Sequence, residues 1–233
     1  MRKQFFDFKM ITIYVILFSA FIVCSLAGNR AISVFSEKNV NSVTVVIDAG
    51  HGGIDGGAVS CTGVYESRIN LEIAQTLDDL MHLLGIQTVM IRDTDQSIHT
   101  EGDTIARKKV SDIRNRVSIV NSTPNALFIS IHQNHFSDSQ YKGAQVFYND
   151  QEGSLVLANE LQEGLRKYLN PQNKRQPKKI SGVYLMEHIN CAGVLIECGF
   201  LSNPQEEYLL RDHGYQKKLS GVIATVISQY LNT

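Results

Sequence analysis

Residues 43–58 read VTVVIDAGHGGIDGGA, in which a β-branched apolar run breaks into a loop with five glycines and one histidine. A continuous run of this kind is typical of a strand that is buried on both faces of a sheet. Glycine lets the backbone take positive φ angles and approach a ligand, because it carries no Cβ. A histidine directly after a buried strand lies where open α/β sheets place their binding sites. Taken alone, the stretch is equally compatible with a plain turn and an incidental surface histidine.

The composition is that of one ordinary globular domain with an extension. The chain has 233 residues, of which 43% are hydrophobic and 19% are charged, and its net charge is −1. This charge gives no indication of nucleic-acid binding, and the basic run at 174–179 predicts a solvated loop. Of the four cysteines, Cys24 lies in an apolar segment, which leaves Cys61, Cys191 and Cys198 without metal-ligand spacing. No disulfide can be assigned to an odd number, and Cys198 is expected in the core.

The N-terminus predicts export across a membrane. Arg2, Lys3 and Lys9 precede an apolar run from Met10 to Gly28 that contains no charge. As a helix, a run of this length spans about 28 Å, close to the hydrocarbon thickness of a bilayer. Basic residues ahead of the run keep that end in the cytoplasm, so the remainder is expected outside. A small-x-small pattern at 25–27 also allows cleavage as a signal peptide, but an uncleaved anchor is the favoured interpretation.

The chain is therefore expected to consist of a signal or anchor segment at 1–28, a polar linker at 29–42 and one domain at 43–233. In that domain apolar strands alternate with amphipathic helices. Strands are expected from residue 43 to the glycine loop and at 86–91, 126–131, 143–148, around 183–185 and 193–196, and helices at 66–84, 103–120, 154–168, 204–211 and 215–231. This alternation predicts a single α/β domain whose mostly parallel, twisted sheet is covered by helices on both faces.

Four polar residues stand at corresponding places in this pattern. His51, His132 and Glu197 each follow a buried strand directly, and Glu66 opens the helix after the glycine loop. The carboxyl ends of parallel strands and the N-termini of the following helices lie at one edge of a sheet, so these side chains are expected to converge. Two imidazoles and one carboxylate are donors that a catalytic zinc ion takes, and the other carboxylate can act as a general base. Each residue alone has an ordinary structural explanation, but four at one edge favour a site.

Four blocks around these residues resemble the signature motifs of zinc-dependent N-acetylmuramoyl-L-alanine amidases. The blocks are VIDAGHGG at 46–53, YESRINL at 65–71, ISIHQN at 129–134 and VLIECGFLSN at 194–203. Segments 88–95 and 116–121 also fit the family pattern, and the resemblance extends over about residues 43–232. It implies that His51, Glu66 and His132 bind one zinc ion and that Glu197 is the catalytic glutamate. It further implies hydrolysis of the amide between the lactyl group of N-acetylmuramic acid and L-alanine in peptidoglycan.

The chain departs from the family pattern near the expected metal. His135 stands where the family usually has a small residue, and Ala192-Gly193 replaces a more usual pair that contains proline. His135 is expected to line the cleft or face solvent, with crowding of the metal or an added ligand as the alternative. Asn134 and Arg92 are candidates for contacts with substrate or with the metal ligands, and structural roles are the alternative for both.

A membrane segment followed by a bare catalytic domain is similar to the spore-cortex amidases of endospore formers, which strip peptides so that muramic-δ-lactam can form. We therefore expect an exported enzyme, anchored to the outer face of the membrane or secreted, with the intermembrane space around the forespore as one candidate location. Two other functions remain open. A zinc exopeptidase on free peptides would usually need more carboxylates for a second metal. A wall-binding protein would leave the site idle, and an intact site can also be idle without an activating protein partner.

Overall fold

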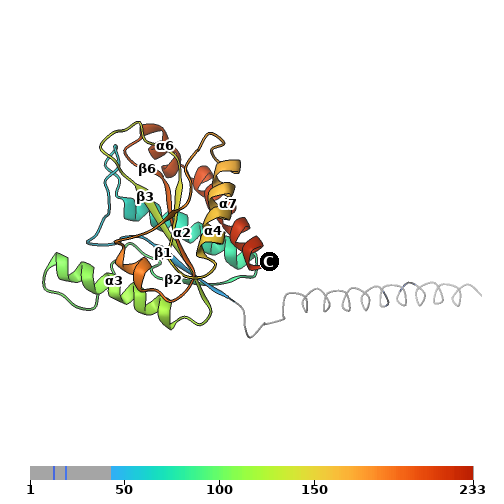
Figure 1. Ribbon diagram of the computed structural model, residues 1–233, viewed down its shortest axis with the longest axis horizontal. Coiled ribbons are helices and arrows are strands. Elements are labelled where there is room, and N and C mark those ends of the chain that lie inside the picture. Colours follow the sequence, from blue (N-terminus) through green and yellow to red (C-terminus); the bar gives the residue numbers. More distant parts are fainter. Residues whose placement is uncertain (1–12, 14–18, 20–42, 233) are drawn as a thin grey trace, which may run out of the picture. The chain divides into compact units, whose positions relative to one another are not determined.

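The apolar run after residue 43 forms β1 (Thr44–Ala49), which lies between two parallel neighbours. The computed structural model describes residues 13, 19 and 43–232, and within them six strands form one sheet in the order β2-β1-β3-β6-β4-β5 (Figure 1). The other strands are β2 (Gln87–Met90), β3 (Ala126–Asn134), β4 (Gln145–Tyr148), β5 (Lys178–Lys179) and β6 (Gly193–Phe200). β4 pairs antiparallel with β6 and the remaining pairs are parallel. The expected α/β domain with a mostly parallel sheet is confirmed.

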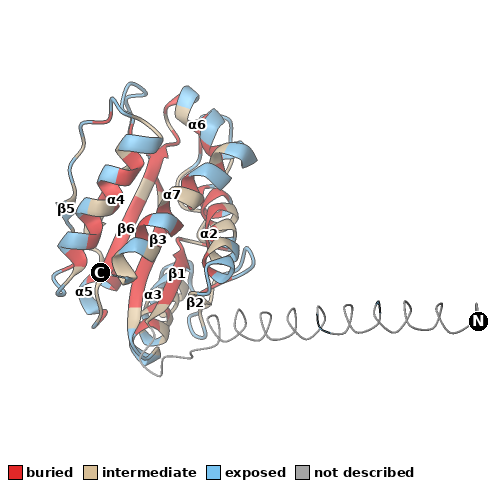
Figure 2. Cartoon of the chain, turned by 90° about the vertical axis from the view of Figure 1, so that its right-hand side faces the viewer, coloured by how far each residue is buried: buried red, intermediate tan, exposed pale blue. Residues whose placement is uncertain are grey.

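Helices cover both faces of this sheet, as its double-sided burial requires. They are α2 (Glu66–Leu83), α3 (Ile105–Ser122), α4 (Ser154–Tyr168), α5 (Tyr184–His188), α6 (Pro204–Arg211) and α7 (His213–Leu231). Val45 and Ile47 pack with α2, α4 and α7 on one face, whereas Val46 packs with α3 and α5 on the other. Figure 2 shows the buried strands between these helix layers. Alternate side chains of a strand point to opposite faces, so β1 contributes to both cores.

The structure differs from the expected elements in two respects that matter for the site. β3 and β6 do not end at His132 and Glu197 but continue past them. The two residues lie inside the paired strands and are partners in the register that joins them. The segment expected as a strand around 183–185 is instead the short helix α5, whose Leu185 and Met186 are buried against the sheet. A short apolar run does not distinguish a strand from a buried helical turn by periodicity alone.

The described residues leave the membrane prediction open. Apart from positions 13 and 19, the expected anchor and linker at 1–42 lie outside the described residues. No helix in the described part of the chain is long and apolar enough to cross a membrane. The residues from Val43 onward form a compact unit of their own.

Candidate active site

Three of the expected site residues form a compact donor group. His51 lies in the glycine loop after β1, Glu66 is the first residue of α2, and His132 lies within β3. One nitrogen or oxygen from each residue lies within 4.8 Å of the others. Glu66 Oε1 lies 3.0 Å from His132 Nδ1, and Glu66 Oε2 lies 3.3 Å from His51 Nε2. Two imidazoles and a carboxylate at these separations can hold a metal ion.

The Glu66 carboxylate is fixed from its far side by hydrogen bonds. Its Oε1 accepts from the side-chain amide of Asn70 and the backbone N–H of Gln133, each at 3.1 Å. Its Oε2 accepts from the backbone N–H of Ala58 at 3.0 Å. Asn70 is fully buried one helical turn after Glu66 and also donates to the Gly50 carbonyl. Outer partners of this kind orient metal ligands, and the sequence interpretation assigned no role to Asn70.

Glu66 and His51 carry complementary charges. Burial raises the pKa of Glu66, but hydrogen bonds and charge from His132 and His51 outweigh it and hold that pKa well below its usual range. Burial lowers the pKa of His51, and its bonds to Asp55 and Glu66 outweigh this effect and raise the pKa to about 9. Without a metal the group is therefore an anionic carboxylate between two imidazoles. A metal cation would bind between these donors.

Two glycines in the loop are required by close approach to these donors. A Cβ on Gly50 would lie 2.2 Å from His132 Nε2, and a Cβ on Gly57 would lie 2.6 Å from Glu66 Oε2. Gly57 also has a φ of 68°, a conformation that side chains with a Cβ rarely adopt. The glycine-rich loop is therefore part of the site and not a plain turn.

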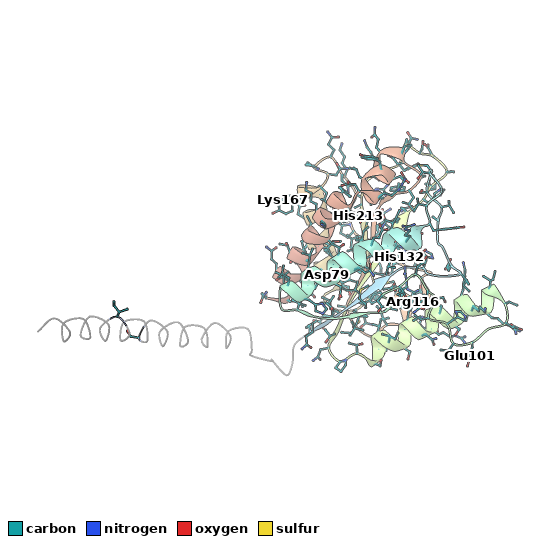
Figure 3. The ribbon with its side chains drawn as sticks, turned by 180° about the vertical axis from the view of Figure 1, so that it is seen from behind. Asp79, Glu101, Arg116, His132, Lys167 and His213 are labelled. Atoms are coloured by element: carbon teal, nitrogen blue, oxygen red, sulfur yellow. The ribbon has the colours of Figure 1, made fainter. Side chains whose placement is uncertain are left out.

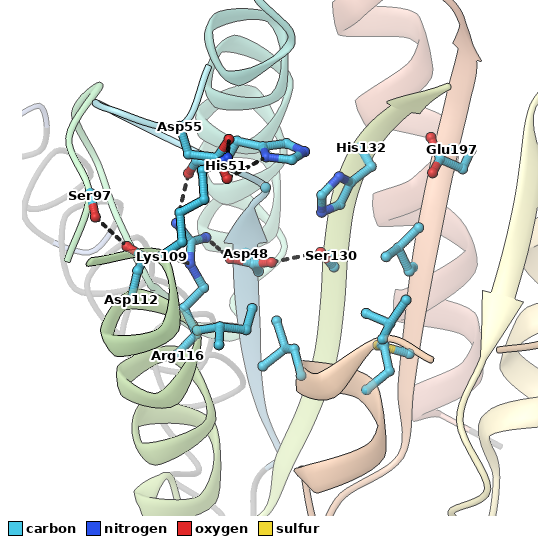
Figure 4. A pocket seen from close by; sticks show the side chains of 16 residues that line it. Asp48, His51, Asp55, Ser97, Lys109, Asp112, Arg116, Ser130, His132 and Glu197 are labelled. Carbon is cyan, nitrogen blue, oxygen red and sulfur yellow. Dashed lines mark hydrogen bonds and ion pairs between the residues drawn. The ribbon is translucent and has the colours of Figure 1, made fainter. Parts of the chain in front are cut away.

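Glu197 lies opposite His132 in the register between β3 and β6. Its Oε2 is buried without a hydrogen-bond partner among the described residues. Burial raises the pKa of Glu197 to about 7, against the lowering effect of His132. Glu197, His51 and His132 line one pocket of about 310 Å³ (Figure 4). A carboxylate with an unused oxygen and a near-neutral pKa in a pocket is suited to accept a proton from a bound molecule.

Comparison with known proteins identifies this arrangement. The model of the N-acetylmuramoyl-L-alanine amidase family matches residues 45–229, which include the whole donor group and Glu197. The chain belongs to this family. It is 37% identical over 188 residues to the germination-specific N-acetylmuramoyl-L-alanine amidase of Bacillus subtilis, with 80% of this chain and 78% of that protein covered. The family resemblance of the four sequence blocks is thereby confirmed.

Solved structures of family members have the same fold. The CwlD amidase from Clostridioides difficile, in complex with the GerS lipoprotein, is 38% identical with a TM-score of 0.79, and the match covers 82% of this chain and 99% of that one. An N-acetylmuramoyl-L-alanine amidase from Clostridium difficile 630 is 29% identical with a TM-score of 0.72, over 83% of this chain and 98% of that one.

A buried ionic network supports the glycine loop that follows β1. Arg116 of α3 bonds to Asp48 of β1 and donates to the backbone carbonyl of His51 at 2.7 Å. The Ser130 hydroxyl donates to the second Asp48 oxygen at 2.7 Å. In Figure 3, Arg116 and His132 lie among the secondary-structure elements, whereas Glu101 lies at the periphery. The sequence signals for this network are an aspartate at the end of an apolar strand and the fit of segment 116–121 to the family pattern.

The other residues named from the sequence lie outside the donor group. Arg92 is buried and donates to the backbone carbonyls of Ala49, Gly50, Ser67 and Thr94, so it braces the loop. Asn134 is half-buried at the end of β3, and His135 is exposed directly after it. The structure therefore gives Arg92 a structural contact, and it brings neither Asn134 nor His135 into the group that can hold a metal.

Proposed function

We propose that this chain is a zinc-dependent peptidoglycan amidase that hydrolyses the bond between the lactyl group of N-acetylmuramic acid and L-alanine. The observation that carries this proposal is the unpartnered Glu197 carboxylate in the pocket that His51 and His132 also line. Family membership supplies the reaction, and the site supplies residues that suit it. Hydrolysis of an amide needs an activated water, an acceptor for its proton and a donor to the leaving nitrogen.

His51, Glu66 and His132 would hold the zinc ion. Their two nitrogens and one oxygen are a common catalytic donor set, which leaves a position open for water or substrate. When bound, zinc supplies Lewis acidity toward the scissile carbonyl and the attacking water. The group fits this cation because Glu66 is anionic and already fixed by three hydrogen bonds on its outer side.

Glu197 would carry the proton. In its ionised form it takes a proton from the attacking water, and in its protonated form it gives that proton to the alanine nitrogen as the amide breaks. Burial raises the pKa of the Glu197 carboxylate toward neutrality, which suits both steps. The register between β3 and β6 supports this role, because it pairs Glu197 with His132, a member of the donor group.

We infer that the enzyme acts on spore-cortex peptidoglycan outside the cytoplasm. Its support is the similarity to a germination-specific amidase of Bacillus subtilis and to the CwlD amidase. The apolar run at 10–28 would anchor it, although this run lies outside the described residues apart from positions 13 and 19. CwlD was solved in complex with the GerS lipoprotein, which supports a lipoprotein partner for this chain as well.

The test is to digest purified peptidoglycan with the full chain and zinc and to identify the new ends by mass spectrometry. An amidase releases stem peptides with a free L-alanine amino group and leaves intact muramic acid lactyl carboxylates. An exopeptidase would release amino acids and leave the lactyl amide intact. Absence of new ends, with the chain retained on the wall, would indicate a binding protein. Within the described residues a single His/Glu group can hold a metal, which disfavours the two-metal exopeptidase.

His135→Ala is expected to keep zinc and most of the activity. His135 is exposed and outside the donor group, and three protein ligands already leave the open position that catalysis needs. The measurement is the zinc content per chain and the rate of peptide release, with His132→Ala as the matched loss of a ligand. A loss of zinc as large as that of His132→Ala would make His135 a ligand.

A further inference from the structure

The two nitrogens of His51 face different partners. Nε2 faces the Glu66 carboxylate at 3.3 Å, on the side of the donor group. Nδ1 lies 3.0 Å from Asp55 Oδ2, on the opposite side of the ring (Figure 4). An imidazole that binds a metal through one nitrogen carries its proton on the other, and an acceptor for that proton fixes both the tautomer and the ring orientation. Asp55 stands in that place.

Asp55 is itself held by a residue from another element. Lys109 Nζ of α3 lies 2.8 Å from Asp55 Oδ1, and the backbone N–H of Gly57 donates weakly to the same oxygen at 3.4 Å. Each Asp55 oxygen therefore has a separate partner, His51 on one and Lys109 on the other. The lysine comes from a helix 54 residues further along the chain, so it fixes the loop relative to the packed domain.

The same helix also fixes the His51 backbone. His51 has a φ of 63°, which is uncommon for a residue with a Cβ, and Arg116 of α3 donates to its carbonyl oxygen at 2.7 Å. α3 thus holds His51 at two points, through Arg116 at the backbone and through Lys109 and Asp55 at the ring. The ring direction of a residue follows from its backbone as well as from its side-chain torsions, so both contacts bear on where Nε2 points.

We propose that Asp55 and Lys109 are positioning residues that hold His51 with Nε2 toward the metal, so that metal affinity depends on both. The inference rests on the proposed function only in taking His51 as a ligand. An ordinary surface ion pair between Asp55 and Lys109 would contribute little to the stability of the fold. This pair differs because Asp55 also bonds to His51, so it connects Lys109 to a proposed metal ligand. Asp55 is not itself in the donor group, since it lies on the Nδ1 side of the ring.

The test is the dissociation constant for zinc of the full chain, measured by competition with a chromophoric chelator. Asp55→Ala is expected to weaken zinc binding about 10- to 100-fold, the usual cost of losing an outer partner of a metal ligand. Lys109→Met should weaken it by about two- to fivefold, because Asp55 loses one partner but keeps its bond to His51. An unchanged dissociation constant for Lys109→Met would overturn the role of Lys109. Lys109→Arg should keep the wild-type dissociation constant. In the double variant, Lys109→Met should add nothing to the loss of affinity that Asp55→Ala causes. Asp103→Ala, which breaks an exposed pair with Arg107, is the control without effect.

A spectroscopic readout separates positioning from damage to the fold. The side chains of Asp55 and Lys109 are 28% and 48% exposed, so both variants are expected to fold. In the zinc-loaded wild type, ¹⁵N spectra of labelled histidine should show a proton on His51 Nδ1 that is protected from exchange. Asp55→Ala should lose that protection, while Asp55→Asn, which keeps an acceptor oxygen, should retain part of it.

The outcomes distinguish this proposal from that for the whole site. If His51→Ala loses zinc but Asp55→Ala stays within twofold of the wild type, the positioning role is wrong and the metal site stands. If His51→Ala keeps zinc, His51 is not a ligand and both proposals fail. An additive loss in the double variant would show that Lys109 acts without Asp55, which would also overturn the proposed chain of contacts.

Discussion

Glu197→Gln is expected to lower turnover by roughly 10²–10⁴-fold while the chain stays folded and keeps its zinc, because the substitution removes one positioned proton-transfer group. Glutamine preserves the size of the side chain and an acceptor oxygen, but it cannot take a proton from water at neutral pH. Glu197 lies outside the donor group of His51, Glu66 and His132, so zinc affinity should change little. The variant should also still bind muramyl peptide, since the pocket keeps its shape.

The measurement is the rate of stem-peptide release at saturating zinc, together with zinc content, because incomplete loading would mimic the catalytic defect. His135→Ala serves as a control substitution outside the donor group, and it should leave the rate nearly unchanged. Near-normal turnover of Glu197→Gln with zinc retained would remove Glu197 from the mechanism. A loss of zinc in parallel with the loss of activity would make it a ligand.

The same substitution should stabilise the metal-free protein at alkaline pH. Burial raises the pKa of Glu197 from 4.5 to about 7, so folding favours its protonated form. The group therefore contributes no penalty below about pH 4.5, and stability is lost as pH rises through about 7. At pH 8 the free energy of unfolding of Glu197→Gln should exceed that of the wild type by on the order of 2 kcal/mol. The difference should vanish near pH 4, as measured by chemical denaturation with a chelator present.

The site could be located from the sequence because parallel topology brings strand ends together. His51 follows β1 and Glu66 begins α2, as this topology predicts. His132 and Glu197 do not end their strands as expected, and they lie together because they are partners in the register between β3 and β6. Some helix limits were predictable from capping residues. Asn203, which accepts hydrogen bonds from two backbone N–H groups, begins α6 ahead of Pro204 as a cap residue should.

What supports the site was harder to predict, because it consists of contacts between distant side chains. Lys109 and Arg116 look like exposed charges on an amphipathic helix, and only the packing of α3 beside β1 shows that both reach the His51 loop. Asn70 is the exception whose contact the sequence could have shown, since it lies four residues after Glu66 on one helix face. The helix α5 was missed because five residues are too few for a 3.6-residue period to show.

Glu66→Gln is expected to abolish zinc binding under conditions that load the wild type, with affinity reduced by more than the ~10²-fold upper value for an outer partner. The substitution removes the anionic member of the donor group, which leaves two imidazoles without the charge that attracts the cation. It also disturbs the donors behind Glu66. Asn70 and the Gln133 N–H donate to one carboxylate oxygen and the Ala58 N–H to the other, so the single oxygen of glutamine leaves one side unpaired.

The comparison that decides the roles is Glu66→Gln against Glu197→Gln, with zinc content and turnover measured on both. Glu72→Gln, on the same helix, controls for a general effect on α2. We expect Glu66→Gln to lose metal and activity together, and Glu197→Gln to lose activity alone. The reverse pattern would exchange their roles. Reversal would contradict the geometry. Glu66 has an oxygen near each imidazole, and the hydrogen bonds and charge of His132 and His51 keep it ionised, whereas burial favours the protonated form of Glu197. A ligand must hold its charge and a general base must be able to lose it, and the two carboxylates differ in that respect.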